Sequence, residues 1–279
     1  MELTLAVLNA DWGEIEENIE RFIRDYIERT RAAGLVIGLS GGIDSCTTAA
    51  LSARAIGGDK VLGLQLPEKE NQNAKDCKHA NIVAKKFGFS TETVDITPSL
   101  EIFYKTIPSF NPCDNVSKGN AKARMRMTYL YYYANRLKSL VCGSSDKSET
   151  MIGYFTKWGD VAADIHPIMD LYKTQVRQLA KHLGIPEEII SKPSSPRLWR
   201  GQMAEKELGI KYEQLDLILY GLEHFMKAEE LAERLRIDKD VIEKVKGRWL
   251  SSEHKRRVLL AAKLEYRTIG ADFRLPRGP

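Results

Sequence analysis

The segment with the clearest chemical pattern is Ser-Gly-Gly-Ile-Asp-Ser at residues 40–45. It follows the short apolar run at residues 35–39, which is typical of a buried strand, and it precedes small residues typical of a helix. Adjacent glycines let the backbone approach a ligand, and the free amides of a helix N-terminus attract phosphate. Asp44 would repel a bare phosphate but suits one that shares Mg²⁺ with it. The segment predicts a nucleotide phosphate site, and an ordinary helix cap is the alternative.

Two more polar segments follow. Residues 119–127 carry several cations at the start of a helix expected over residues 120–137, where they would oppose the helix dipole. Either they form a solvated basic face or they serve a ligand. Residues 143–174 combine Lys, Asp, Glu and Thr with aromatic residues. A pocket for phosphates, Mg²⁺ and a flat ring needs such groups.

Together these segments resemble the ammonia-dependent NAD synthetases, a family of the ATP pyrophosphatase superfamily. Those enzymes split ATP between the α- and β-phosphates and adenylate a substrate. The resemblance spans roughly residues 35–222 and 254–256. It is carried by S-G-G-x-D-S (40–45), G-N-x-K-A-R-x-R-M (119–127), K-S-E (147–149), G-Y-F-T-K-x-G-D (153–160), L-Y-K-T (171–174) and L-W-x-G-Q (198–202).

The resemblance implies a role for particular residues. The expected ATP contacts are Gly38, Leu39, Ser40, Gly41, Gly42, Ile43, Asp44, Ser45, Ser144, Lys173 and Ser194. The expected Mg²⁺ ligands are Asp44 and Glu149. The expected contacts of the deamidated dinucleotide, deamido-NAD, are Arg124, Lys157, Asp164, His254 and Lys255.

The implied reaction has two steps. The nicotinate carboxylate of deamido-NAD attacks the α-phosphorus of ATP, and ammonia then displaces AMP from the adenylate. Residues 191–202, rich in Pro, Ser and Arg, are the expected lid that excludes water from the adenylate. There is no room ahead of Ser40 for a glutaminase domain, so the resemblance implies free ammonia as the nitrogen source. It also implies a homodimer with the dinucleotide at the subunit interface.

The match departs from the family pattern in three places. After L-W-x-G-Q the family commonly has Thr-Asp-Glu, whereas this chain has Met203, Ala204 and Glu205, so the usual acidic residue is missing. Asp146 stands where the family usually has Asn. The tail over residues 259–279 is longer than the family's short ending and receives no assignment.

The hydrophobic pattern predicts an α/β fold. Apolar runs at residues 35–39, 61–66, 92–96 and 140–143 alternate with helical patterns at 44–55, 73–87 and 120–137. Such alternation favours a Rossmann-like parallel sheet with helices on both faces, which binds ligands beyond the carboxyl ends of its strands. Further helices are expected over residues 11–33, 171–183 and 212–263. We expect one domain over residues 1–279, made of an N-terminal helix (1–34), the core (35–222) and a helical C-terminal segment (223–279).

Composition argues against several other classes of protein. The 42 Lys and Arg exceed the 38 Asp and Glu only slightly, which makes no case for a nucleic-acid partner. No apolar run approaches the roughly 18 residues of a membrane span, and the first residues do not read as a secretory signal. The four cysteines never form a C-x-x-C pair. A cytoplasmic protein with reduced thiols is therefore expected.

Two rival functions stay open at this point. Another adenylating enzyme of the superfamily, such as a tRNA thiolation enzyme, would share the phosphate segment but usually needs a reactive cysteine pair. Residues 228–249 fit a DNA-binding helix-turn-helix, with basic residues between 244 and 257 facing phosphates. A helical pair packed on the catalytic core is the simpler interpretation of that segment.

Overall fold

A parallel sheet organises the computed structural model, which describes residues 3–71, 73–257, 261–264 and 266. Within these residues the strands lie in the order β3-β2-β1-β4. Their bounds are β1 (Leu35–Gly38), β2 (Val61–Gln65), β3 (Ser90–Thr93) and β4 (Leu140–Cys142). After β3 the chain crosses to the other side of β1, so the topological switch lies between β1 and β4. The predicted parallel α/β fold is confirmed, and its ligand crevice is expected at this switch.

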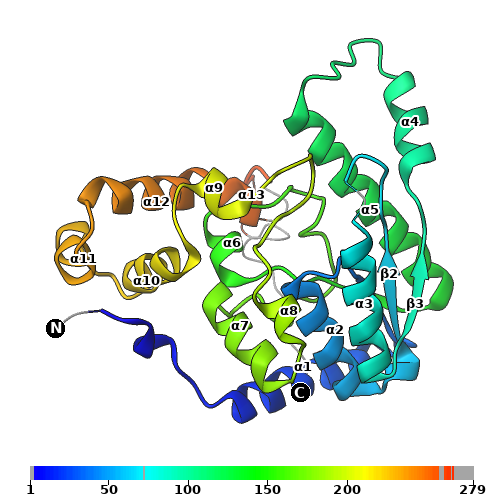
Figure 1. Cartoon of the computed structure of the whole chain (residues 1–279), viewed down its shortest axis with the longest axis horizontal. Coiled ribbons are helices and arrows are strands. Elements are labelled where there is room, and N and C mark those ends of the chain that lie inside the picture. The colour runs from blue at the N-terminus through cyan, green and yellow to red at the C-terminus, as the bar shows by residue number, and fades with distance from the viewer. Residues whose placement is uncertain (1–2, 72, 258–260, 265, 267–279) are drawn as a thin grey trace.

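Helices cover both faces of the sheet (Figure 1). Leu35 and Ile37 of β1 pack toward one group of helices, and Val36 packs toward the other, because successive strand residues point to opposite faces. The first group is α1 (Trp12–Thr30), α2 (Ile43–Ile56), α3 (Ala74–Phe87), α7 (Lys173–His182) and α8 (Glu187–Ile190). The second is α4 (Thr97–Lys105) and α5 (Asn115–Leu137). Two 3-10 turns, η1 (Leu5–Leu8) and η2 (Gly58–Lys60), complete this part.

The apolar side chains of α1 form a stripe along one side of the helix, which packs on the hydrophobic core beside the sheet. Ile23 is fully buried, and Ile15 and Ile19 pack against the same cluster as β1 and α2. The helix begins where Asp11 accepts hydrogen bonds from the first free backbone amides, as its sequence predicts. Phe22 alone of the stripe stays substantially exposed, at 44%.

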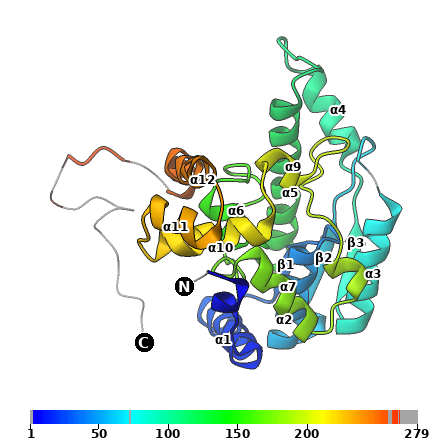
Figure 2. The same ribbon diagram turned by 60° about the vertical axis from the view of Figure 1, so that its left-hand side comes forward.

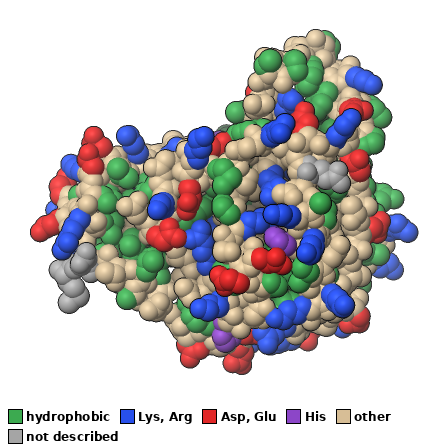
Figure 3. All heavy atoms as spheres, in the orientation of Figure 1, with side chains coloured by type: hydrophobic (Ala, Val, Ile, Leu, Met, Phe, Trp, Pro, Cys, Tyr) green, Lys and Arg blue, Asp and Glu red, His purple; other side chains and the backbone are tan. Residues whose placement is uncertain are grey.

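The helices toward the C-terminus lie together beside the sheet domain in Figure 2 and share a second hydrophobic core. It involves α6 (Lys147–Met151), α9 (Ala204–Leu208), α10 (Tyr212–Glu223), α11 (Ala228–Leu235) and α12 (Lys239–Ser251), and α13 (Glu253–Arg256) follows. Leu231 of α11 and Ile242 of α12 are fully buried in it. The segment that fits a helix-turn-helix is therefore a helical pair packed on α10, as the simpler interpretation predicts. Acidic and basic side chains are interspersed over the face drawn in Figure 3.

Three expected elements differ from the structure. The third strand lies at Ser90–Thr93 instead of residues 92–96, because its parallel pairing with β2 begins at Ser90, opposite Leu62, and ends at Thr93, opposite Gln65. The helix expected from residue 120 begins at Asn115, because Asp114 caps it through the Ser117 amide at 2.9 Å. The C-terminal helices end at Arg256, and residues 261–264 are not helical. Residues 258–260 and most of the tail at 259–279 lie outside the described residues.

All four cysteines are free, in agreement with their scattered positions. Burial raises the pKa of Cys46 and of Cys142 to about 12, so neither is a reactive thiolate. No helix among the described residues is long and apolar enough to cross a bilayer.

One buried carboxyl joins three of these helices. Asp216 of α10 is fully buried and accepts hydrogen bonds from the Ser148 hydroxyl in α6 and from the Thr174 amide, at 2.8 Å, in α7. Burial raises the pKa of Asp216 to about 6. Because the folded state then holds the proton more tightly than the unfolded state, this group favours folding below about pH 4 and loses that effect as the pH rises through 6.

We predict that Asp216→Asn flattens this pH dependence. Between pH 4 and pH 7 the free energy of unfolding of the wild type should fall by about 3 kcal/mol relative to the variant, at about 1.36 kcal/mol per pKa unit. Urea unfolding of both proteins at a series of pH values measures the difference. Parallel pH profiles would show that Asp216 ionises normally in the folded protein.

Candidate active site

The segment at residues 40–45 forms a tight loop between β1 and α2. Gly41 has a φ of +69°, and a Cβ there would lie 2.1 Å from the backbone oxygen of Asp76 at the start of α3. Ser40 accepts from the Gly42 amide at 3.2 Å, and Ser45 donates to the Gly42 oxygen at 3.1 Å. No side chain caps α2, so the amides of its first turn stay available to a ligand.

Three carboxylates meet beside this loop. Asp44 lies in the first turn of α2, and Asp146 and Glu149 lie at the start of α6 after β4, with one oxygen of each within 4.8 Å of the others. Lys173 lies among them, with its Nζ 2.8 Å from Asp44 Oδ2, 2.5 Å from Asp146 Oδ2 and 3.0 Å from Glu149 Oε1. The Tyr212 hydroxyl donates to Glu149 Oε1 at 2.7 Å. The cluster joins side chains from four helices.

Burial and charge shape the protonation of this cluster. Burial by itself would lower the pKa of Lys173, but Asp146, Asp44 and Glu149 raise it well above its usual value, so the ammonium stays charged. Burial raises the pKa of Asp146 well above its usual value, and the two other carboxylates add to that rise. Burial also raises the pKa of Tyr212, which therefore remains a phenol and a hydrogen-bond donor.

The cluster suits a divalent cation. Asp44 Oδ1 is buried without a hydrogen-bond partner, so it is an acceptor that the protein leaves unused. Three carboxylates and one ammonium carry a formal charge of −2 when all are ionised. Carboxylate oxygens are the ligands that Mg²⁺ prefers. The donor set therefore fits the predicted metal.

A pocket of about 550 Å³ opens at the carboxyl ends of the strands, within the size range of ligand sites. Its walls are the loop at residues 38–45, the segment after β2, part of α5, the loop after β4 and residues 192–199. This is the topological switch between β1 and β4, where the fold predicts a ligand.

Most of the predicted ATP and metal residues line this pocket. They are Gly38, Leu39, Ser40, Gly42, Ile43, Asp44, Ser45, Ser144, Glu149 and Ser194. Gly41 instead packs against Asp76, and Lys173 has no exposed surface, since it lies among the carboxylates. The structure places the Lys173 ammonium among Asp44, Asp146 and Glu149, whose negative charge it offsets.

The residues predicted to contact the dinucleotide are less tightly grouped. Lys255 lines the pocket, and its Nζ donates to the Gly153 and Phe155 oxygens at 2.7 and 2.8 Å. Burial lowers the pKa of Lys255. Three others are linked by hydrogen bonds outside the pocket lining. Arg124 donates to the backbone oxygen of Lys157, and Lys157 Nζ donates to the backbone oxygen of His254 at 2.7 Å. Asp164 lies apart and accepts from the Val141 amide at 2.7 Å.

The structure adds residues that the sequence analysis did not assign. Asp146 joins the predicted metal ligands, and the signal for it was present, since it precedes Glu149 by three residues at the start of a helix. Asp76 holds two cations of residues 191–202, with Lys192 Nζ at 2.6 Å and Arg197 Nη1 at 2.7 Å. Lys192 also donates to the Gly41 oxygen at 2.7 Å. The expected lid is thus fastened to the phosphate loop.

Comparison with known proteins decides the family. The family model described as NAD synthase matches residues 15–259. The chain belongs to the NAD synthase family. It is 48% identical over 253 residues to an NH(3)-dependent NAD(+) synthetase of Methanocaldococcus jannaschii, which covers 88% of this chain and 96% of that protein. An NH(3)-dependent NAD(+) synthetase from Hyperthermus butylicus is 46% identical over 258 residues, and the match covers 92% of this chain and 93% of that protein.

Solved structures of the same family agree. An NMN synthetase from Francisella tularensis superposes with a TM-score of 0.80 at 34% identity, over 91% of this chain and all of that one. An NH3-dependent NAD synthetase from Campylobacter jejuni superposes with a TM-score of 0.76 at 31% identity, and the match covers 91% of this chain and 100% of that one. The resemblance seen in the sequence motifs is confirmed. Membership of the NAD synthase family makes this chain a carbon–nitrogen ligase of NAD biosynthesis.

The close approach of Gly41 to Asp76 predicts a specific defect. In Gly41→Ala the new methyl group meets the Asp76 backbone, so we expect the phosphate loop to shift and ATP to bind at least about tenfold more weakly, a change of about 1.4 kcal/mol. Gly209→Ala is the matched control, because Gly209 has a similar φ of +71° but no described atom within 4 Å of its Cβ position. Both variants carry the left-handed strain of about 1–2 kcal/mol. Calorimetric titration with ATP measures the affinities, and equal affinities in the two variants would contradict the account.

Proposed function

We propose that the protein amidates deamido-NAD with ammonia and ATP, giving NAD, AMP and pyrophosphate. The family supports the reaction class, and the names of the relatives support ammonia as the nitrogen donor. The observation that carries the proposal is that a phosphate-type loop and two carboxylates, Asp44 and Glu149, line one pocket, with Asp146 buried beside them. Such a site serves adenylation, in which two anions must meet.

Asp44 and Glu149 are the residues we assign to Mg²⁺, with Asp146 beside them. When bound, the ion neutralises negative charge on the ATP phosphates. Lys173 keeps the carboxylates paired and so preserves their orientation. The Tyr212 hydroxyl donates to the same Glu149 oxygen that Lys173 contacts, and so helps to orient this carboxylate.

The chain's own groups then serve the first step. The free amides at the start of α2 and the Ser40 hydroxyl face the pocket, where they receive phosphate oxygens. The attacking group is the substrate's own carboxylate, so no protein nucleophile is required. Lys192 and Arg197, which both pair with Asp76, place two more positive charges at the pocket wall, where they can offset negative charge on the leaving pyrophosphate.

The second step needs ammonia inside and water outside. Residues 192–199 and Gln202 line the pocket and are the lid we propose. Ala204, where the family commonly has Asp, is fully buried and offers no acid. Glu207 lines the pocket instead, and it accepts hydrogen bonds from the Tyr154 hydroxyl at 2.5 Å and Gln202 Nε2 at 3.2 Å. This carboxylate is the one we assign to ammonium entry.

A homodimer and a cytoplasmic location complete the proposal. Large apolar side chains stay exposed along α4 and α5, and these support a subunit interface on the two helices. These side chains are Ile102, Phe103, Val116, Tyr132 and Leu137. In Figure 1, α4 and the first part of α5 project beyond the sheet. Four free cysteines support a reducing compartment.

A mononucleotide acid is a second candidate substrate. The Francisella tularensis neighbour is named an NMN synthetase, and it shares the fold over its whole length. Amidation of nicotinate mononucleotide would use the same phosphate loop and carboxylates. Deamido-NAD carries an AMP half that nicotinate mononucleotide lacks. Competition between the two acids therefore reveals which one the pocket prefers.

The function has a direct test. Incubation with ATP, Mg²⁺, ammonium and deamido-NAD should yield AMP and NAD in equal amounts, and Glu149→Gln should lower this rate at least about a hundredfold because a metal ligand is lost. Chromatography of the nucleotides measures both products, and nicotinate mononucleotide added in parallel tests the second substrate. Formation of ADP in place of AMP would rule out the proposed cleavage.

Loss of the lid's aromatic residue should uncouple the two steps. We expect Trp199→Ala to admit water to the adenylate, so that less NAD forms for each AMP released. The matched control is Trp249→Ala, which removes the same side chain from the second hydrophobic core, away from the pocket lining. The NAD-to-AMP ratio is the measurement. An unchanged ratio in Trp199→Ala would remove the lid from the mechanism.

A further inference from the structure

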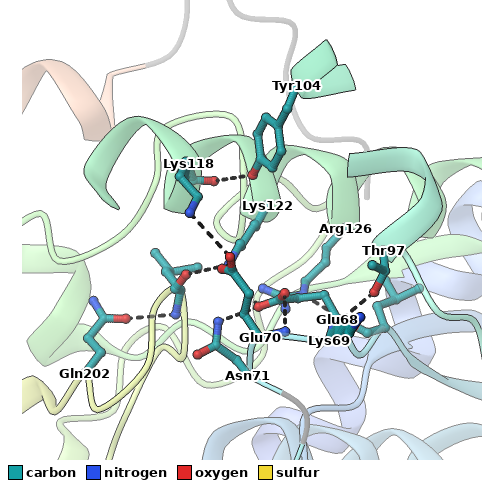
Figure 4. Close-up of polar contacts among 12 residues, drawn as sticks. Glu68, Lys69, Glu70, Asn71, Thr97, Tyr104, Lys118, Lys122, Arg126 and Gln202 are labelled. Atoms are coloured by element: carbon teal, nitrogen blue, oxygen red, sulfur yellow. Dashed lines mark hydrogen bonds and ion pairs between the residues drawn. The ribbon is translucent and has the colours of Figure 1, made fainter. Parts of the chain in front are cut away.

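A buried lysine joins the lid to the rest of the pocket. Lys122 lies in the middle of α5 with 2% of its side chain exposed. Its Nζ donates to Glu68 Oε1 at 2.9 Å, to Glu70 Oε2 at 2.7 Å and to the Leu198 oxygen at 3.1 Å (Figure 4). Glu68 and Glu70 follow β2, and Leu198 belongs to the lid. The ammonium therefore holds three chain segments together.

The hydrogen-bonding capacity of this ammonium is fully used. An ammonium has three N–H donors, and here each has one acceptor. If the lid moved away, one buried donor would lose its partner, which costs free energy. The closed position of the lid and the satisfaction of Lys122 therefore depend on each other.

The lid also lies directly on α5 at this point. A Cβ at Gly119, one turn before Lys122, would lie 2.9 Å from Leu198 Cβ and 3.3 Å from a ring carbon of Trp199. The Leu198 amide in turn donates to Gln202 Oε1 at 2.8 Å. Both backbone polar groups of Leu198 are therefore hydrogen-bonded, the oxygen to Lys122 and the amide to Gln202. The lack of a side chain at position 119 is what lets the lid come so close.

The segment after β2 is held by the same helix. Glu68 is 4% exposed and accepts from the Glu70 amide at 3.0 Å, and Arg126 Nε donates to the Leu66 oxygen at 3.1 Å. The hydrogen bond from Lys122 lowers the pKa of Glu70, so that carboxyl stays ionised. Leu66 and Glu68 line the pocket. The cations of the 119–127 segment thus have a purpose other than a solvated face.

We propose that Lys122 is a positioning residue for the lid, which it fastens to the segment after β2 through Leu198, and that it thereby sets how much of the cleaved ATP ends as NAD. Lys122 does not line the pocket, so it acts through these neighbours and not on a substrate. The expected effect on the amount of NAD formed for each ATP cleaved rests on the proposed function. The effect on the lid does not.

The first test follows the lid without any substrate. Trypsin can cut the lid after Arg197 and after Arg200, and in Lys122→Met we expect this cleavage to be about fivefold faster than in the wild type, because a buried hydrogen bond to the lid is gone. Lys118→Met is the matched control. Lys118 lies one turn earlier on α5, where its Nζ contacts the same Glu70 at 3.4 Å and donates to the Pro112 oxygen at 3.3 Å, and neither of these partners belongs to the lid. Lys122→Arg, which keeps the charge, should restore part of the protection.

The second test uses the reaction. The NAD-to-AMP ratio should fall in Lys122→Met and stay at the wild-type value in Lys118→Met. A role confined to stability would lower the melting temperature of Lys122→Met but leave both the ratio and the cleavage rate of the folded protein unchanged, and that result would overturn the proposal. If the wild type makes no NAD, the proposed function fails, while the cleavage experiment still judges the role of Lys122.

A third variant covers poor folding of Lys122→Met. Gly119→Ala removes no charge and favours the helix, but its methyl group meets Leu198. We expect faster cleavage of the lid and a lower NAD-to-AMP ratio here too, with the melting temperature maintained. A lid that stays protected in Gly119→Ala would contradict the close seating on which the proposal depends.

Discussion

The structure depends on one buried charge arrangement, the Lys173 ammonium among Asp44, Asp146 and Glu149. Lys173 and Asp146 are both fully buried, and removing one partner from such a buried ion pair typically costs about 3–5 kcal/mol. Because they come from α2, α6 and α7, the cluster fixes where those helices meet. The same arrangement leaves negative charge facing the pocket, beside the loop that we propose binds phosphates. A divalent cation that bridges the two is the simplest way to balance them.

Local patterns predicted the parts of the site that one segment builds by itself. The loop at residues 40–45 needs only a buried strand, two glycines and a helix, and all three are visible in the sequence. The start of α5 was placed wrongly because the residues after 114 show little apolar periodicity, although Asp114 with Ser117 is a helix cap. This error made the cations of α5 look like a conflict with the helix dipole. In the folded chain they lie in the middle of the helix.

Contacts between distant segments could not be predicted in that way. Lys173 and Asp44 are 129 residues apart, and Lys122 and Leu198 are 76 apart. Such pairs arise from the order of the strands and the packing of α2, α5 and α7, which the hydrophobic pattern of a single sequence does not specify. The resemblance to a family supplied roles for individual residues, but it could not show that Lys173 lies beneath the carboxylates instead of on the pocket wall.

The lid is held from two directions, and this gives the pocket its shape. Asp76 binds Lys192 and Arg197 beside the phosphate loop, while Lys122 binds Leu198 on the side of α5. A segment without helix or strand structure is thereby ordered by buried charges at its base. The water exclusion proposed for the second step and the charge compensation proposed for the first would both depend on these contacts.

The central claim is that Asp44 and Glu149 share one divalent cation with the phosphates of ATP. Crystals grown with a non-hydrolysable ATP analogue and Mn²⁺ test it most directly, because manganese gives an anomalous signal that locates the ion. We predict one peak within bonding distance of both carboxylates and of a phosphate oxygen held by the loop at residues 40–45. Nucleotide bound with the two carboxylates directed to different places, and no ion between them, would contradict the account.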